Sequence, residues 1–123
     1  MSLATVLRLN ALSCFVFGGI FLLQPSGVAA FLGAPPVPLI AALGAALLIN
    51  AALLWASQHK GRAPQRHEVL FFCLGDGLWV LATLVLLAFG LWITATAGQV
   101  TALGVAAMVG TLGVLQWRAL PVQ

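Results

Sequence analysis

Apolar residues dominate four long stretches of the chain, at residues 3–23, 38–57, 68–91 and 99–117. Each stretch is close to the roughly 20 residues that a helix needs to cross a bilayer. The stretches are rich in Leu and Ala and lack the alternation of polar and apolar residues that is typical of a strand. The pattern therefore predicts an all-α integral membrane protein, a compact bundle of four transmembrane helices that forms a single membrane domain over residues 1–123.

The segment between the first two stretches is not simply polar. Gln24–Gly27 ends the first stretch, and an apolar run at 27–33 follows before Pro35 and Pro36. This run has two readings, a short helix on the outer surface or a hydrophobic loop packed on the helix ends. Both readings fit the sequence.

Charged residues are few, and their positions suggest an orientation in the membrane. The chain is 63% hydrophobic and 6% charged, whereas soluble domains average about 25% charged residues. Three of its five basic residues, Lys60, Arg62 and Arg66, lie between the second and third stretches. Because basic loops face the cytoplasm, we expect this segment, and with four spans both termini, on the cytoplasmic side of an inner membrane. The cations form no basic run with interleaved aromatic residues, so nucleic-acid binding is not expected.

Two residues of opposite charge interrupt the apolar stretches. Asp76 is the only charged residue between positions 69 and 117, and Arg8 lies near the start of the first stretch. A charge at membrane depth costs at least a few kcal/mol, so each is expected to have a partner or a role. The carboxyl group is either neutral or ionised beside Arg8, and we expect the two side chains to form a pair.

Other polar side chains fall at a similar depth. Counted inward at about 1.5 Å per residue, Asn10 and Asn50 lie about 10 Å from the inner boundary and Asp76 about 12 Å, whereas Gln116 lies near the boundary itself. Trp79 lies deeper and needs a protein or polar neighbour for its N–H. This cluster is a structural clasp, a site for a solute or proton, or a contact with a partner or lipid headgroup. Its candidate residues are Arg8, Asn10, Asn50, Asp76, Trp79 and Gln116.

Small residues predict close packing between helices. They recur every four positions at Ala42, Ala46 and Asn50 in the second stretch and at Ala102, Ala106 and Gly110 in the fourth. Such residues let helix backbones approach closely in lipid. Gly75 and Gly77 flank Asp76, and we interpret them as packing residues, with the alternative that Gly77 leaves room for a ligand.

The sequence contains no convincing catalytic or metal-binding pattern. It has no GxSxG, HExxH or glycine-rich phosphate loop. Cys14 and Cys73 have no CxxC or Cys/His spacing, so we expect structural thiols. His67 and Glu68 are adjacent, so their side chains point about 100° apart on a helix, and Glu68 is more simply a favourable charge at a helix N-terminus. We expect no cofactor and no metal.

Three classes of function remain open, and a non-catalytic membrane module is the one we favour. An accessory or assembly subunit, or a module that binds a lipid or another ligand, needs only a rigid bundle with an apolar exterior. A transporter or channel would use Asp76 for a cation or proton and Arg8 for an anion, and would require a homo-oligomer. A lipid-modifying enzyme would use His67, Glu68 and Asp76. The expected partners are the lipid bilayer and a second copy or a larger membrane complex.

Overall fold

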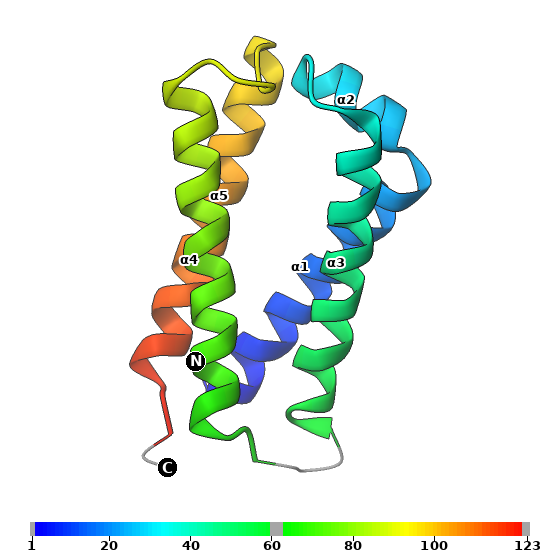
Figure 1. Cartoon of the computed structure of the whole chain (residues 1–123). Helices are drawn as coiled ribbons and strands as arrows, with labels where there is room; N and C mark the ends of the chain where they lie inside the picture. The colour runs from blue at the N-terminus through cyan, green and yellow to red at the C-terminus, as the bar shows by residue number, and fades with distance from the viewer. Residues whose placement is uncertain (1, 60–62, 122–123) are drawn as a thin grey trace.

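The computed structural model describes residues 2–59 and 63–121, which form five α-helices and, within these ranges, no β-strand. The helices are α1 (Leu3–Leu23), α2 (Pro25–Leu32), α3 (Val37–Ala56), α4 (Arg66–Ala88) and α5 (Thr96–Arg118) (Figure 1). The all-helical class is therefore confirmed. The helices α1, α3, α4 and α5 are each long and apolar enough to cross a membrane, and they begin and end within a few residues of the four predicted stretches.

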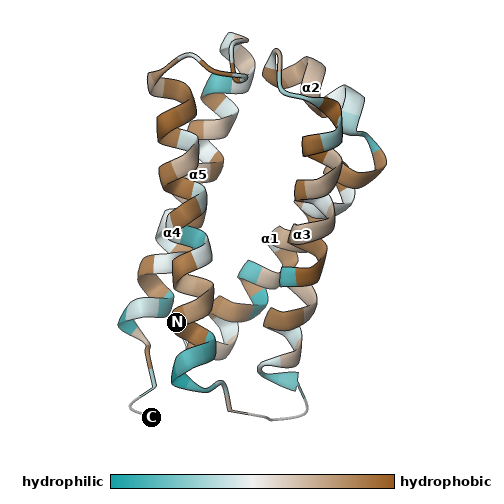
Figure 2. Ribbon diagram, in the orientation of Figure 1, coloured by the Kyte–Doolittle hydropathy of each residue, from teal (hydrophilic) through white to brown (hydrophobic). Residues whose placement is uncertain are grey.

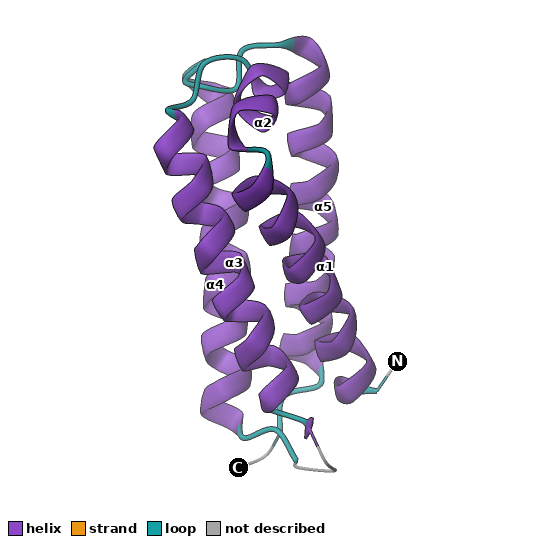
Figure 3. Cartoon of the chain, turned by 90° about the vertical axis from the view of Figure 1, so that its right-hand side faces the viewer, coloured by secondary structure: helices purple, strands orange, loops and turns teal. Residues whose placement is uncertain are grey.

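The four long helices pair into two hairpins. In the first, α1 packs along α3, and in the second, α4 packs along α5 (Figure 1). The hairpins meet where α1 contacts α5, whereas α3 and α4 make no extensive contact within the described residues. Figure 3 shows the same arrangement from the side of the α1–α3 hairpin. Neighbouring helices are therefore in contact on three sides of the bundle, whereas α3 and α4 on the fourth side have little contact.

The surface of the hairpins is apolar almost throughout. Figure 2 shows hydrophobic residues along most of the length of the four long helices. Large side chains such as Leu23 and Phe89 are 79% and 75% exposed. A surface of this kind suits lipid acyl chains, because a water-soluble protein rarely exposes contiguous apolar patches of this extent.

Two glycines bring α1 and α3 into close contact. A Cβ atom at Gly44 would lie 2.6 Å from the backbone nitrogen of Leu22 and 2.8 Å from the backbone oxygen of Gly18. A Cβ atom at Gly18 would lie 2.9 Å from the backbone oxygen of Gly44. The packing face predicted for α3 was wrong, because Ala42 and Ala46 are exposed and Gly44 is buried. In α5, by contrast, Ala106 of the predicted face is buried, and Ala102 and Gly110 are half-buried.

At the end of the bundle far from the termini, the segment after α2 meets the loop between α4 and α5. Gly33 and Ile93 form an isolated antiparallel bridge, and the backbone N–H of Ala34 donates to the carbonyl oxygen of Trp92 at 2.8 Å. Gly33 has a φ of 136°, which residues with a side chain rarely adopt. The short helix that was one of two readings for 27–33 is present as α2, and the segment that follows it joins the hairpins at this end.

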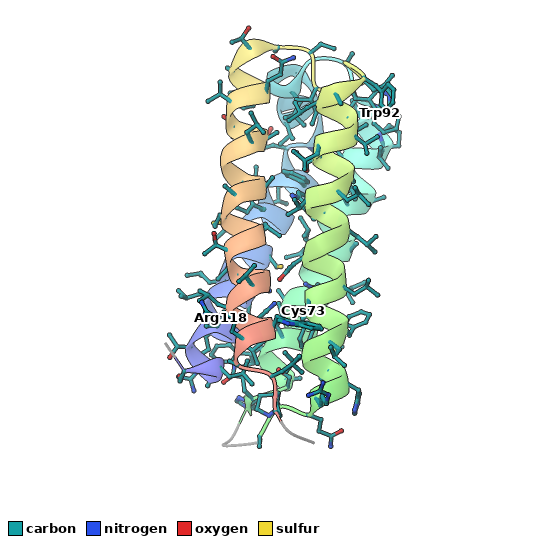
Figure 4. The ribbon with its side chains drawn as sticks, turned by 90° about the vertical axis from the view of Figure 1, so that its left-hand side faces the viewer. Cys73, Trp92 and Arg118 are labelled. Atoms are coloured by element: carbon teal, nitrogen blue, oxygen red, sulfur yellow. The ribbon has the colours of Figure 1, made fainter. Side chains whose placement is uncertain are left out.

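Basic residues lie at the opposite end. Arg66 begins α4 and Arg118 ends α5, and the guanidinium of Arg66 donates to the carbonyl oxygen of Pro121 at 3.0 Å. In Figure 4, Arg118 and Trp92 mark opposite ends of the α4–α5 hairpin. The other two cations of the predicted basic loop, Lys60 and Arg62, lie outside the described residues.

The contact between α1 and α3 predicts a position-dependent effect of adding one methyl group. Gly44→Ala should lower the free energy of unfolding by about 1–3 kcal/mol, because the new Cβ overlaps backbone atoms that cannot move independently. The matched control is Gly19→Ala, whose Cβ would have no neighbour within 4 Å. Reversible unfolding in mixed micelles measures both. An equal free energy of unfolding for Gly44→Ala and Gly19→Ala would contradict the close approach of α1 and α3 at Gly44.

Candidate functional site

Asp76 lies at the centre of a buried polar cluster that joins three helices. Its Oδ2 accepts hydrogen bonds from Gln116 Nε2 at 2.7 Å and from Asn10 Nδ2 at 3.1 Å. Asn10 Nδ2 also donates to Gln116 Oε1 at 2.8 Å. The three residues, which we call the polar cluster, are 2% (Asn10), 6% (Asp76) and 0% (Gln116) exposed. Because Asn10 belongs to α1 whereas Asp76 and Gln116 belong to α4 and α5, the cluster links the two hairpins through the protein interior.

A glycine on α5 allows Asp76 to reach its partner. Gly113 lies about one turn before Gln116, and a Cβ atom at Gly113 would lie 3.2 Å from Asp76 Cβ. A larger residue at Gly113 would therefore displace the Asp76 side chain. The absence of a side chain there lets α4 and α5 approach closely enough for the short bond between Gln116 and Asp76.

Two free thiols lie beside the polar cluster. Cys14 donates from Sγ to Asn10 Oδ1 at 3.6 Å and accepts from Asn50 Nδ2 at 3.4 Å, which connects α3 to the cluster indirectly. Cys73 donates to the backbone oxygen of Gly113 at 3.6 Å, across the contact between α4 and α5 (Figure 4). Within residues 2–59 and 63–121, no group of three or more His, Cys, Asp or Glu side chains is placed to hold a metal ion.

Arg8 does not pair with Asp76. Its Nε donates to Gln58 Oε1 at 2.9 Å, and the residue is exposed. Two positions along an α-helix correspond to a rotation of about 200°, so a helix that turns Asn10 toward the interior turns Arg8 away from it. The predicted ion pair is therefore wrong. The amide groups of Asn10 and Gln116 bond the carboxyl group instead.

A cavity of about 210 Å³ lies beside the polar cluster and is lined by all four long helices. Its volume exceeds that of the roughly 150 Å³ engineered cavity known to admit benzene, but it is smaller than the roughly 300–1,000 Å³ of sites for drug-sized ligands. The polar groups are contributed by Asn10, Ser13, Cys14, Asn50 and Asp76. The apolar walls are formed mainly by Phe17, Leu43, Leu47, Trp79, Val105 and Val109.

The cavity opens to the surface of the protein between α3 and α4. Of the residues that line it, Ala46 on α3 and Phe71 and Gly75 on α4 are exposed. This is also the side on which the two hairpins lack extensive contact. Gly75 lines the cavity without a side chain, and a Cβ atom there would have no neighbour within 4 Å. The residue that leaves room beside Asp76 is thus Gly75; Gly77 does not line the cavity.

The Trp79 ring on α4 lies 6.4 Å from the ring of Phe21 on α1, measured between centroids. It forms part of the apolar wall of the cavity. This contact provides a second, apolar link between the hairpins. It also places a fluorescent side chain at the cavity surface.

The structure brings five of the six candidate residues together. Asn10, Asp76 and Gln116 form the polar cluster, and Asn50 and Trp79 line the adjacent cavity. Gln116 is fully buried, although its position near the end of the fourth stretch suggested a boundary residue. Ser13 and Cys14 also line the cavity, and the sequence analysis did not predict this. Cys14 lies four residues after Asn10, which places both side chains on one helix face, and this spacing could have identified it.

Comparisons of the chain with protein-family models, with curated proteins and with solved structures found no match. The function of the site must therefore be inferred from its own geometry and chemistry.

The polar cluster predicts that its two amide residues act together. Asn10→Ala and Gln116→Ala should each lower the free energy of unfolding by about 1–2 kcal/mol, the range measured for hydrogen bonds between membrane helices. Because each amide bonds both the other and Asp76, the double variant should lose less than the sum of the two losses. Thr111→Ala, which removes a hydroxyl bonded only to the Ala107 carbonyl of its own helix, is the control. Strictly additive losses would show that the two amides do not share one network.

Proposed function

We propose that this protein is a non-catalytic integral membrane module that binds a small amphiphilic molecule in the cavity between its two hairpins. The observation that carries this proposal is a cavity that is lined by both polar groups and apolar side chains and that includes exposed residues of α3 and α4. Ligand sites in proteins combine these two features, since apolar walls supply affinity and a few polar groups fix orientation.

The cavity distinguishes a binding role from a purely structural role for the polar cluster. A cluster that only fixes helix positions would be served best by close packing around it, because protein interiors contain few voids larger than a water molecule. Here the space next to Asp76 and Asn50 is kept open, and Gly75 supplies no side chain to fill it. The open volume thus favours a module that holds a ligand.

The same geometry favours binding over catalysis. His67 is exposed at the start of α4, and its nine-residue separation from Asp76 corresponds to about 14 Å along the helix. Glu68 Oε1 accepts a hydrogen bond from the backbone N–H of Gln65 at 3.0 Å, as a residue that caps the start of a helix does. The three residues considered for a lipid-modifying enzyme therefore do not converge on one point.

Transport also receives less support than binding. Among the described residues, five polar ones line the cavity, and its other lining residues are apolar or glycine. The role considered for Arg8 beside Asp76, where it would hold the carboxyl group ionised, is not supported, because Arg8 bonds Gln58 instead. A module that captures a ligand from the bilayer needs neither a continuous polar path nor an assembly of several copies.

We further propose that the protein lies in an inner membrane with both termini in the cytoplasm. Arg66 and Arg118 lie at the end of the bundle where the chain begins and ends, which the preference of basic residues for the cytoplasm supports. Trp92 lies near the opposite end (Figure 4), where an aromatic side chain suits the interface between lipid and water.

This orientation predicts opposite labelling of two introduced cysteines. In intact spheroplasts, a membrane-impermeant maleimide should label Thr94→Cys, in the loop between α4 and α5, and should label Ala63→Cys, before α4, only after permeabilisation. Both positions are exposed, and native Cys14 and Cys73 are buried and half-buried. The reverse pattern would invert the proposed topology.

Ligand capture predicts a saturable response of Trp79 to a small amphiphile. In nanodiscs, 2-phenylethanol should change the fluorescence of a variant in which Trp55, Trp92 and Trp117 are replaced by Phe, since Trp79 lines the cavity. Gly75→Leu should abolish the response by filling the cavity.

The matched control for this experiment is Gly77→Leu. It adds the same side chain two residues away, also at a position with no neighbour within 4 Å, but Gly77 does not line the cavity. It should keep the response to 2-phenylethanol. A response that is equal in both variants would indicate simple partitioning of the alcohol into lipid and would contradict binding in the cavity.

A further inference from the structure

Asp76 lies at the cavity with no positively charged partner. Within residues 2–59 and 63–121, its only side-chain partners are the amide N–H groups of Asn10 and Gln116. Arg8, which lies two residues before Asn10 on α1, donates to Gln58. A carboxylate at this depth is tolerated only if a proton or a cation neutralises it, because an isolated charge in a membrane is strongly disfavoured.

We propose that the cavity selects a small hydrophobic amine in its protonated form, with the ammonium group against Asp76 and the apolar part against the aromatic walls. This inference rests on the proposed binding function and specifies its ligand. The described residues that line the cavity include no Lys, Arg or His, so none of them would neutralise a bound anion.

The oxygen atoms around the cavity match the donors of an ammonium group. Asp76 Oδ1 receives only a long contact of 3.5 Å, from Asn10 Nδ2. Asn50 uses its amide nitrogen to donate to Cys14, which leaves its carbonyl oxygen as an acceptor. Ser13 adds a hydroxyl oxygen to the lining. A primary ammonium carries three N–H donors and no acceptor, so these three oxygen atoms suit it better than they suit a hydroxyl or a carboxylate.

The rest of the cavity suits the apolar part of such a molecule. Phe17, Phe71 and Trp79 line it, and the faces of aromatic rings attract a nearby cation. The volume of about 210 Å³ admits a ring or a short chain but not a lipid headgroup with its glycerol and phosphate. The opening between α3 and α4 lets such a molecule enter from the bilayer.

A comparison of two probes of nearly equal shape tests this inference. Phenethylammonium and 2-phenylethanol differ in the charged group, and each can be titrated in nanodiscs at pH 7 with Trp79 fluorescence as the readout. The protein with Trp55, Trp92 and Trp117 replaced by Phe serves as the wild type of this experiment. Wild-type protein should bind the ammonium at least about tenfold more tightly, as expected for a hydrogen bond between charged groups. Asp76→Asn, which keeps the size of the side chain, should remove this preference, so that the affinities of the two probes for the variant lie within about twofold of each other.

The other possible outcomes of this experiment each lead to a different conclusion. Equal affinity of the two probes for wild-type protein would overturn the selection of a cation while leaving cavity binding intact. A preference that persists in Asp76→Asn would show that Asp76 is not the group that recognises the charge. The proposed binding function fails as well if neither probe gives a saturable fluorescence response, or if Gly75→Leu does not remove that response. If Asp76→Asn does not fold, the wild-type preference decides alone, since it requires no variant.

Discussion

The structure depends on one set of hydrogen bonds, those that join Asn10, Asp76 and Gln116 across the boundary between the two hairpins. In a bilayer, apolar side chains gain nothing by leaving lipid for protein, so apolar surfaces alone do not determine how two hairpins pair. Polar groups do, because a buried amide or carboxyl without a partner is costly. The cluster thus fixes the relative position of the hairpins in the half of the bundle nearer the termini, and the backbone bridge between Gly33 and Ile93 fixes it at the far end.

The cavity follows from this arrangement. The hairpins touch where α1 meets α5 and at the polar cluster, and they diverge between α3 and α4. The space that remains next to Asp76 is lined by both apolar side chains and hydrogen-bonding groups. In the proposed function, the residues that hold the two hairpins together also present a carboxyl group to the ligand. Such a dual role would explain why a residue that is costly to bury is placed where only amide groups bond it.

Much of the fold could be predicted from the sequence, because the length and apolar character of the four stretches suffice to define membrane helices. The faces that the helices bury could not be predicted in this way. Each helix is apolar on all sides, so no amphipathic pattern indicates which side meets protein, and Gly44 rather than Ala42 and Ala46 proved to be the contact on α3. The same limitation produced the wrong pair between Arg8 and Asp76, because the sequence did not specify the rotation of each helix about its own axis.

The most direct test of the central claim measures the distance between the hairpins. Spin labels at the lipid-facing positions Leu53 on α3 and Leu74 on α4, in a background with Cys14 and Cys73 replaced by Ser, report this distance by double electron–electron resonance. If the polar cluster holds the hairpins together, the background protein should give one narrow distance distribution, and adding Gln116→Leu should broaden it or shift it to longer distances. An unchanged narrow distribution in the Gln116→Leu protein would show that other contacts determine how the hairpins pair.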